Sequence, residues 1–174
     1  MRTTRRQALR ALAAAPAAAF LPLHAACIAQ EDDLPPAGPL GAAGEAASEG
    51  LTDFALNLHG QLCGASPARN AFVSPWSVWT ALAMLAEGAR GRTREQLILA
   101  LGLEGPAGRS DNLRAGAGEL RARLARAGRG KKVSLTTADA LWADKRFDLA
   151  EPVVKALRDA YGAELARVDF AEDP

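Results

Sequence analysis

Few residues in this sequence could perform chemistry, and they are widely separated. Of the 174 residues, two are histidines, His24 and His59, and two are cysteines, Cys27 and Cys63. His59 and Cys63 are four positions apart, which is the helical spacing of two metal ligands, but the sequence offers no third ligand beside them. A half-buried thiol on an ordinary helix surface is therefore favoured over a metal site.

Neither histidine has a serine or an acid nearby with which it could form a hydrolytic centre, and the sequence contains no nucleophile elbow and no phosphate-binding loop. Nothing around Cys63 indicates the electropositive setting of a cysteine nucleophile. The sequence therefore predicts a protein that is not an enzyme and that needs no cofactor.

The charge distribution gives little support to a polyanionic partner. The net charge is +1, but four arginines lie in the first ten residues, so 17 basic residues face 20 acidic ones elsewhere, and no nucleic-acid partner is expected. Eight basic residues gather over 109–132, scattered around a predicted helix and interrupted by Gly116, Gly118 and Gly128. A solvated helix face is favoured there over polyanion binding.

Residues 1–29 resemble an export signal. The arginine pair at Arg5 and Arg6 precedes an apolar stretch over 11–23, which is too short to span a bilayer. The pattern predicts a signal peptide similar to twin-arginine signals, although Ala8 replaces the large apolar residue that usually follows the pair. An extracellular, periplasmic or cell-surface location is expected.

Cys27 allows two interpretations. The run LHAAC ending at Cys27 resembles a lipobox, in which the cysteine is lipidated and tethers the protein to a membrane, although His24 occupies the place of the usual leucine. Alternatively, cleavage occurs nearby and Cys27 is incidental. Residues 30–50 are rich in Ala, Gly and Pro with scattered acids, and this composition predicts a flexible tether.

The segment NAFVSPWSVWTALAMLAEGARGRTREQL over 70–97 is the most informative part of the chain. Residues 71–73 predict a short buried strand. Ser74 followed by Pro75 predicts a helix start, because the hydroxyl can accept from a free N–H and proline needs no N–H at the first helical position. The helix that follows is apolar nearly all round, so it should be buried on all sides, with Ser77 pointing into protein.

The next helix and the remaining elements complete the pattern. Thr93 and Gln96 match a capping box, in which each side chain satisfies a backbone N–H at the start of a helix. Further segments predict helices over 51–62, 113–124 and 148–161, a strand over 133–143 and an extended stretch over 163–170. Helices and strands without regular alternation predict an α+β fold.

These segments together resemble the serpin family. LTDFALNLHGQL over 51–62 is similar to the first helix of that family, and 70–97 is similar to its buried strand, second helix and third helix, including the Ser-Pro-x-Ser start and the GA-x-G turn. The stretches ADALW, AYGAEL and VDF follow in the family's order and spacing. The resemblance covers the chain from about Leu51 to Phe170.

The resemblance implies a serpin fold and an inhibitor of serine or cysteine proteases. In that family a protease cleaves an exposed reactive loop, which then inserts into the central sheet while the protease remains attached as an acyl enzyme. Ser74, Ser77 and Asp139 match the conformational-switch (shutter) region beneath the sheet, where hydroxyls can exchange partners. The basic helix over 113–124 corresponds to one that binds heparin in some members. The alternative is a non-inhibitory relative or a surface-tethered binding lipoprotein.

Two features depart from the family pattern. Asp139 stands where asparagine is usual, and a buried aspartate would need a cationic or N–H partner. Family members are also more than twice as long, and the reactive loop and most of both sheets have no counterpart here. We therefore expect 51–174 to be a truncated amino-terminal part of a serpin domain, with part of the central sheet and one strand of the second. Alone it should be inactive, and its unpaired strand edge should favour aggregation.

Overall fold

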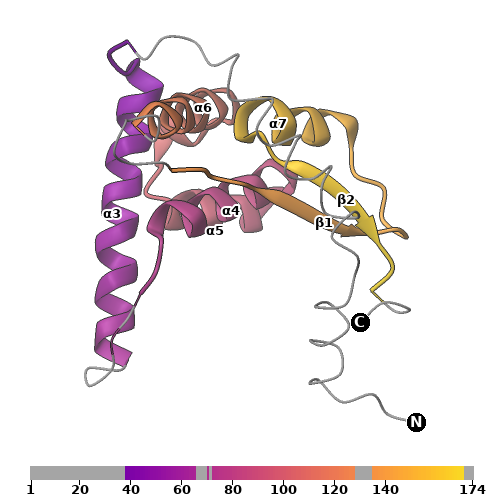
Figure 1. Cartoon of the computed structure of the whole chain (residues 1–174), viewed down its shortest axis with the longest axis horizontal. Coiled ribbons are helices and arrows are strands. Elements are labelled where there is room, and N and C mark those ends of the chain that lie inside the picture. Colours follow the sequence, from indigo (N-terminus) through magenta and orange to yellow (C-terminus); the bar gives the residue numbers. More distant parts are fainter. Residues whose placement is uncertain (1–37, 66–69, 71, 128–134, 171–174) are drawn as a thin grey trace. The chain divides into compact units, whose positions relative to one another are not determined.

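The computed structural model describes residues 38–65, 70, 72–127 and 135–170. The chain divides into a unit that ends at Leu34 and a unit that begins at Pro35, and every element described belongs to the second unit. In chain order these elements are α3 (Ala42–Ala65), α4 (Pro75–Gly88), α5 (Gly91–Ala100), the 3-10 helix η2 (Gly105–Gly108), α6 (Ser110–Ala127), β1 (Ala140–Asp144), α7 (Glu151–Tyr161) and β2 (Glu164–Val168) (Figure 1). The predicted α+β class is confirmed.

Helix α3 starts well before the predicted helix. Residues 42–50, whose composition predicted a flexible tether, are helical. Small residues stabilise this part of α3 because they let it lie close to α6. A Cβ added at Gly116 of α6 would stand 2.5 Å from the Ala43 carbonyl oxygen and 2.7 Å from the Ala47 side chain. Residues 30–37 of the predicted tether lie outside the described residues.

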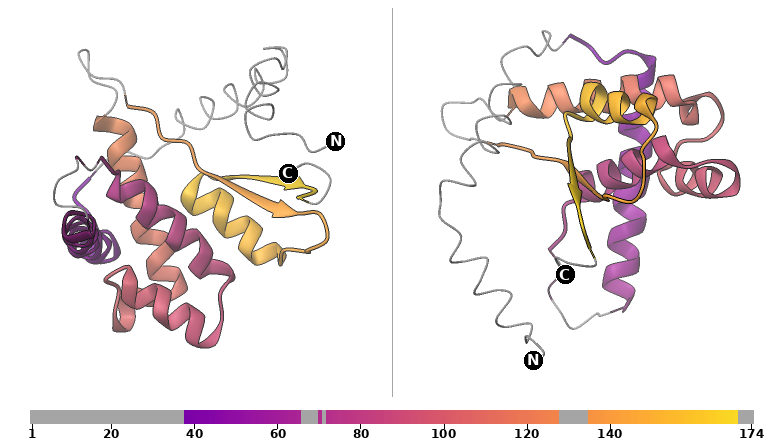
Figure 2. Two further views of the ribbon diagram at one scale, coloured as in Figure 1. Left: turned by 90° about the horizontal axis from the view of Figure 1, so that it is seen from below. Right: turned by 90° about the vertical axis from the view of Figure 1, so that its right-hand side faces the viewer.

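Helix α6 is the central element of this unit, because it contacts α3, α4 and α7. Figure 1 shows α6 and α7 in a row above α4 and α5, with α3 running across the end of both pairs. Figure 2 shows the same helices from two other directions, with the two strands beside α7. The strands and the helical layers therefore meet at α7 and at the segments that flank it.

The core is built around Trp79 of α4. Trp79 has no exposed surface, and its indole N–H donates to the carbonyl oxygen of Leu101, the residue that ends α5 (3.1 Å). Its ring stacks on that of Trp76, with the centroids 6.1 Å apart. Other fully buried large side chains come from α6, from α7 and from the segment after α5: Leu103, Leu113, Leu157 and Tyr161.

Helix α5 does not begin at the predicted capping box. It begins at Gly91 with Arg90 as its N-cap residue, and no side chain caps it. Thr93 and Gln96 therefore lie inside the helix. The positive φ of Gly91 (53°) lets the chain turn into the helix earlier than the capping pattern suggested. The Arg90 guanidinium instead donates to the carbonyl oxygen of Glu87 (3.1 Å), close to the end of α4.

The two strands pair in parallel, with α7 as the crossover between them. The register runs from Ala140 opposite Glu164 to Asp144 opposite Val168. Gly162 ends α7 in the left-handed conformation (φ 64°), directly after the helix predicted over 148–161. The strand predicted over 133–143 is shorter in the described residues, because only 140–144 has a partner strand.

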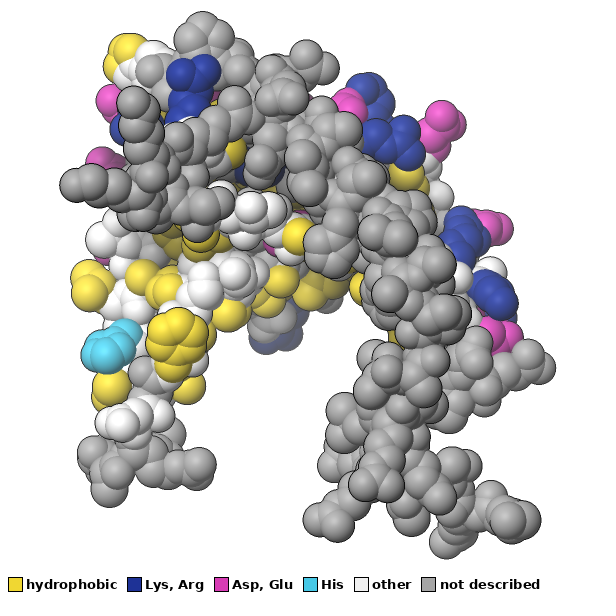
Figure 3. Space-filling model, viewed as in Figure 1, with side chains coloured by type: hydrophobic (Ala, Val, Ile, Leu, Met, Phe, Trp, Pro, Cys, Tyr) yellow, Lys and Arg dark blue, Asp and Glu magenta, His cyan; other side chains and the backbone are white. Residues whose placement is uncertain are grey.

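One side of α4 is open, contrary to the prediction that this helix is buried on all sides. Trp79, Ala83 and Glu87 are buried, but Leu85 is 53% exposed. Phe72 lies outside any strand and is fully exposed, because a strand needs partner strands and no described residue pairs with it. Figure 3 shows hydrophobic side chains along this open side of α4 and on the lower half of α3.

Candidate functional site

Ser74 caps α4 as predicted. Its hydroxyl accepts a hydrogen bond from the Ser77 N–H (3.3 Å), and Pro75 follows as the first helical residue. Ser77 is exposed rather than directed into the protein, and its hydroxyl donates to Ser74 Oγ (3.0 Å). In the described part of the chain the two hydroxyls therefore bond to each other, and neither bonds to Asp139.

Asp139 lies immediately before β1 and is half-buried. Its backbone carbonyl accepts a hydrogen bond from the Glu164 N–H (3.1 Å), which extends the strand pairing by one residue. A positive charge that acts on this carboxylate comes from Arg121 of α6. Burial raises the pKa of Asp139, and the charge of Arg121 opposes that rise. Burial likewise lowers the pKa of Arg121, and the charge of Asp139 opposes that fall.

A buried polar cluster that the sequence analysis missed joins α4, α6 and α7. The Glu87 side chain is 0% exposed, and its Oε2 accepts hydrogen bonds from Arg114 Nη2 (2.7 Å) and Nε (3.0 Å). The Tyr161 hydroxyl donates to Glu87 Oε1 (3.2 Å). The hydrogen bond to Glu87 raises the pKa of Arg114, and burial, followed by the charge of Glu87, raises the pKa of Tyr161.

The sequence did contain a signal for this cluster. Glu87 is the one acidic residue in α4, a helix that is otherwise mostly apolar. An acid on such a helix must find partners when the helix packs, because burying an unpaired carboxylate costs several kcal/mol or more. The identity of the partners was not visible, since Arg114 and Tyr161 lie 27 and 74 positions away.

Arg94 ties the surrounding segments to α4. Its guanidinium donates to the carbonyl oxygens of Ala86 (2.6 Å) and Gly108 (2.9 Å) and to Ser110 Oγ (3.1 Å). These three acceptors lie at the end of α4, the end of η2 and the start of α6. One side chain of α5 therefore fixes the position from which α6 begins.

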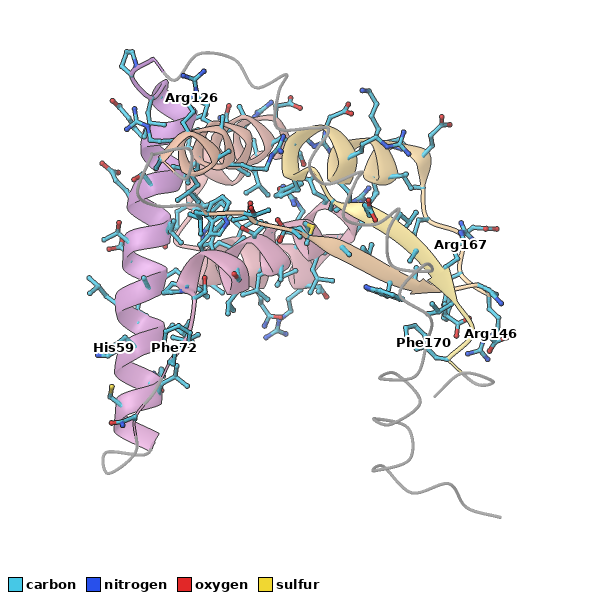
Figure 4. All side chains as sticks on the ribbon, in the orientation of Figure 1. His59, Phe72, Arg126, Arg146, Arg167 and Phe170 are labelled. Carbon is cyan, nitrogen blue, oxygen red and sulfur yellow. The ribbon has the colours of Figure 1, made fainter. Side chains whose placement is uncertain are left out.

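The arginines of α6 are divided among several directions. Arg114 bonds to Glu87 of α4, and the Arg121 guanidinium lies against Gly162 at the end of α7. Arg123 is exposed and donates to the Gly38 carbonyl oxygen (3.1 Å). Arg126 lies toward the opposite end of α6 from α7 (Figure 4). This division favours the interpretation of a solvated helix face over a polyanion site.

His59 and Cys63 lie together on α3, as their spacing predicts. The Cys63 Sγ atom is 3.4 Å from His59 Nε2, and Cys63 is exposed rather than half-buried. Figure 4 shows His59 on the part of α3 that extends past α4. Among the described residues no three side chains are grouped as a metal site would require. Cys27, the candidate lipidation site, lies outside them.

The far end of the two strands presents an exposed aromatic and charged surface. Trp142, Phe147 and Phe170 are each more than half exposed. Arg146, near Phe170 in Figure 4, donates to both carboxylate oxygens of Asp144 (2.8 and 2.7 Å). These hydrogen bonds lower the pKa of Asp144 to about 2. No helix within the described ranges is long and apolar enough to cross a membrane.

Two comparisons at the sequence level identify relatives. A family model described as serpin (serine protease inhibitor) matches residues 49–174. Leukocyte elastase inhibitor of Bos taurus is 35% identical over 130 residues, which cover 75% of this chain and 33% of that protein. Corticosteroid-binding globulin of Bos taurus is 33% identical over 120 residues, which cover 69% of this chain and 29% of that protein. The chain thus spans about a third of the length of these relatives.

The solved structures agree with the sequence comparisons. Human thyroxine-binding globulin, cleaved in its reactive loop, superposes with a TM-score of 0.63 and 26% sequence identity, over 72% of this chain and 36% of that chain. The matched residues 49–174 include most of α3 and every later element through β2. The chain belongs to the serpin family.

Proposed function

We propose that this chain supplies the amino-terminal part of a serpin that inhibits serine or cysteine proteases. The family match over 49–174 carries the proposal, and the similarity to leukocyte elastase inhibitor supports an inhibitory function. In the proposed reaction a protease cleaves a reactive loop supplied by a later part of the protein. The cut loop then inserts into the sheet to which β1 and β2 belong, and the protease stays attached as an acyl enzyme. No side chain of this chain is catalytic.

Ser74, Ser77 and Asp139 take part in the proposed opening of the sheet. The Ser77 hydroxyl donates an exposed hydrogen bond to Ser74 Oγ (3.0 Å). Other hydrogen-bond partners can replace this contact at little steric cost. Asp139 leads directly into β1, so any movement of that strand changes its surroundings. We propose that these three residues belong to the conformational-switch region by family position.

The open side of α4 is consistent with this proposal. A serpin domain of the relatives' length contains, in addition to the part matched by this chain, about twice that number of residues. These further residues can cover Leu85 and Phe72. Covering such large apolar side chains contributes about 1.5–3 kcal/mol for each one fully buried. The described unit therefore exposes apolar side chains that lie in the interior of the proposed complete domain.

A second candidate is a non-inhibitory serpin or a surface-tethered binding lipoprotein. The similarity to corticosteroid-binding globulin favours it, because that relative is named for a bound ligand and not for a protease. The sequence at the hinge of the reactive loop separates the two candidates: small residues permit insertion, whereas bulky or charged residues oppose it.

The decisive experiment compares the 174-residue chain with the same chain extended by the reading frame that follows Pro174. Both proteins are incubated with a panel of serine and cysteine proteases. The extended protein should form a covalent complex that survives denaturing electrophoresis, and the shorter chain should form none. Cleavage of the extended protein without a complex would support the non-inhibitory candidate, and a downstream frame without serpin sequence would refute the proposal.

We also propose that residues 1–29 direct export and that Cys27 becomes a lipid-bearing amino terminus. The arginine pair, the apolar stretch and the small residues before Cys27 support this. Mass spectrometry of the mature amino terminus tests it. A diacylglycerol-sized addition on Cys27 is expected; an unmodified terminus close to Cys27 would support simple cleavage, and an intact Met1 would contradict export.

A further inference from the structure

The start of α3, residues 42–50, is built from small residues and glutamates. Between Leu40 and Leu51 the chain contains only glycine, alanine, serine and glutamate. Two of the glycines, Gly44 and Gly50, lie inside the helix, where glycine is less favourable than every residue except proline. This part of α3 therefore has a weak intrinsic preference for the helix and buries little apolar side chain, so contacts from other elements must stabilise it.

The first such contact is a carboxylate from α6. Gly41 directly precedes α3, and its carbonyl oxygen accepts a hydrogen bond from the Glu45 N–H (2.9 Å), so Gly41 is the N-cap residue. The Gly41 N–H donates in turn to Glu119 Oε2 (2.8 Å). A carboxylate at this place is also favoured by the partial positive charge at the amino-terminal end of the helix.

The Glu119 carboxylate stands where the side chain of a capping box would stand. In a capping box, a glutamate or glutamine at the third helical position reaches back to the N–H of the N-cap residue. The third helical position of α3 is Gly44, which has no side chain. A Cβ added there would stand 3.0 Å from Glu119 Cδ and closer still to its Oε2. Glu119 therefore fills the space left by Gly44 and makes the hydrogen bond that residue 44 cannot make.

Two neighbours of Glu119 on the same face of α6 also contact this segment. Gly116 and Arg123 lie three positions before it and four positions after it, so the three residues share one side of the helix. Gly116 lies against Ala47, and Arg123 donates to the Gly38 carbonyl oxygen (3.1 Å). One face of α6 therefore holds the chain over 38–47, with Glu119 at its centre.

We propose that Glu119 completes the capping box of α3 from another helix and thereby keeps residues 42–50 folded against α6. Without this carboxylate the Gly41 N–H loses its acceptor, and the start of α3 keeps small contacts with α6, such as that of Ala47 with Gly116. The later part of α3 has separate support, because Phe54 lies in the core. Loss of Glu119 should therefore unfold the start of α3 and leave the rest of the unit folded.

A folded start of α3 also protects the link between the amino-terminal segment and the core. Residues 42–50 lie between Cys27 and the buried Phe54, and proteases cut a segment that has opened locally. A cut here would separate the core from the lipid anchor proposed at Cys27. This consequence rests on the proposed anchor, whereas the capping role of Glu119 concerns described residues alone.

Hydrogen exchange of the full 174-residue chain tests the cap. Glu119→Ala should lower the protection factors of the amides at 45–48 on the order of tenfold, the size expected for a lost N-cap bond, and those of α7 by less than about twofold. Glu119→Gln keeps an oxygen acceptor and should keep most of the protection. Glu95→Ala, which removes an exposed glutamate from α5, is the matched control and should change neither set of amides.

A second substitution moves the carboxylate into α3 itself. In the Glu119→Ala background, Gly44→Glu should restore protection at 45–48, because the new side chain can reach the Gly41 N–H. Gly44→Ala supplies the helix preference of alanine without a carboxylate, so Gly44→Glu should exceed its effect about fivefold. In the unaltered chain Gly44→Glu should instead lower the protection, because its Cβ would meet the Glu119 carboxylate.

Digestion with a glutamyl endopeptidase gives an independent readout. Glu45 and Glu49 are exposed, so the rate of cleavage after them depends on how often the helix opens. Glu119→Ala should be cut at these two positions on the order of tenfold faster than the unaltered chain, and mass spectrometry of the fragments identifies the bonds that are cut. Glu95→Ala should be cut there at the rate of the unaltered chain.

Equal exchange at 45–48 in Glu119→Ala and in the unaltered chain would overturn the cap. An effect of Gly44→Glu with the same sign in both backgrounds would also overturn it, as would an equal loss of protection at 45–48 and in α7, because that loss would be a general one. An intact Met1 on the mature protein would refute the proposed anchor and leave these measurements unaffected.

Discussion

Replacing Arg114 by methionine should be among the most damaging single changes on the surface of α6. Arg114 supplies two of the three hydrogen bonds to Glu87, whose side chain is 0% exposed. Methionine fills a similar length of apolar space but carries no charge. The substitution therefore leaves a buried carboxylate to which, among the described residues, only the Tyr161 hydroxyl donates.

The size of the expected loss of stability depends on how deeply each member of the Arg114–Glu87 ion pair is buried. Breaking a buried ion pair by removing one partner costs about 3–5 kcal/mol. The Arg114 side chain is 35% exposed, so part of its attraction to Glu87 is screened by water, and we expect a loss at the lower end of that range, about 3 kcal/mol. A second ion pair gives the control. Asp111 is 88% exposed and lies 3.9 Å from Arg114, so Asp111→Asn should cost less than about 1 kcal/mol.

Urea unfolding followed by tryptophan fluorescence measures both losses, because Trp79 is completely buried in the folded state. The double variant Arg114→Met with Glu87→Gln should recover most of the stability, since a neutral amide needs no counter-ion and its oxygen still accepts from Tyr161. The reasoning is refuted if Arg114→Met costs no more than Asp111→Asn, or if the double variant is less stable than Arg114→Met alone.

Four further changes test other parts of the fold. Because hydrogen bonds from Arg146 lower the Asp144 pKa from 3.8 to about 2, they stabilise the fold above the ordinary pKa, and this stabilisation is lost as the pH falls toward 2. Asp144→Asn should therefore flatten the stability–pH curve in that window. Gly116→Ala should cost about 1–3 kcal/mol, since its Cβ would stand 2.5 Å from the α3 backbone. Gly118→Ala, whose nearest neighbour is at 3.7 Å, should instead stabilise by about 0.5–1 kcal/mol; thermal unfolding checks both. Ser74→Ala should cost about 1 kcal/mol through loss of the N-cap bond, measured by urea unfolding, and no loss would contradict a capping role.

Features that depend on a few neighbouring residues could be predicted from the sequence. Ser74 and Pro75 start α4 because the cap hydroxyl and the N–H that it accepts from belong to the same turn. Gly162 ends α7 because the left-handed conformation is inexpensive only for a residue without a Cβ. In both cases the chemistry that decides the structure lies within four residues.

Features that depend on distant partners could not be predicted. The capping pattern at Thr93 is compatible with a helix start, but α5 begins two residues earlier, at Gly91. The Arg94 side chain donates hydrogen bonds to residues of α4, η2 and α6, which are distant in the sequence. The apolar surface of α4 indicated burial without indicating what would cover it. Composition likewise suggested a tether over 42–50, although small residues also suit a close helix–helix contact.

Gly116 shows how one such contact determines the polar chemistry elsewhere. Arg114 and Gly116 are two positions apart, and therefore about 200° apart around the helix. When Gly116 packs against Ala43 of α3, the rotation of α6 is set, and Arg114 and Arg121 are turned toward the opposite side. The sequence predicted that a buried Asp139 requires a cationic or N–H partner, and it did not indicate which of the arginines on α6 would lie nearest. The direction of Arg121 follows from the contact of Gly116 with α3, so one of the glycines that interrupt the basic helix also selects which of its charges become buried.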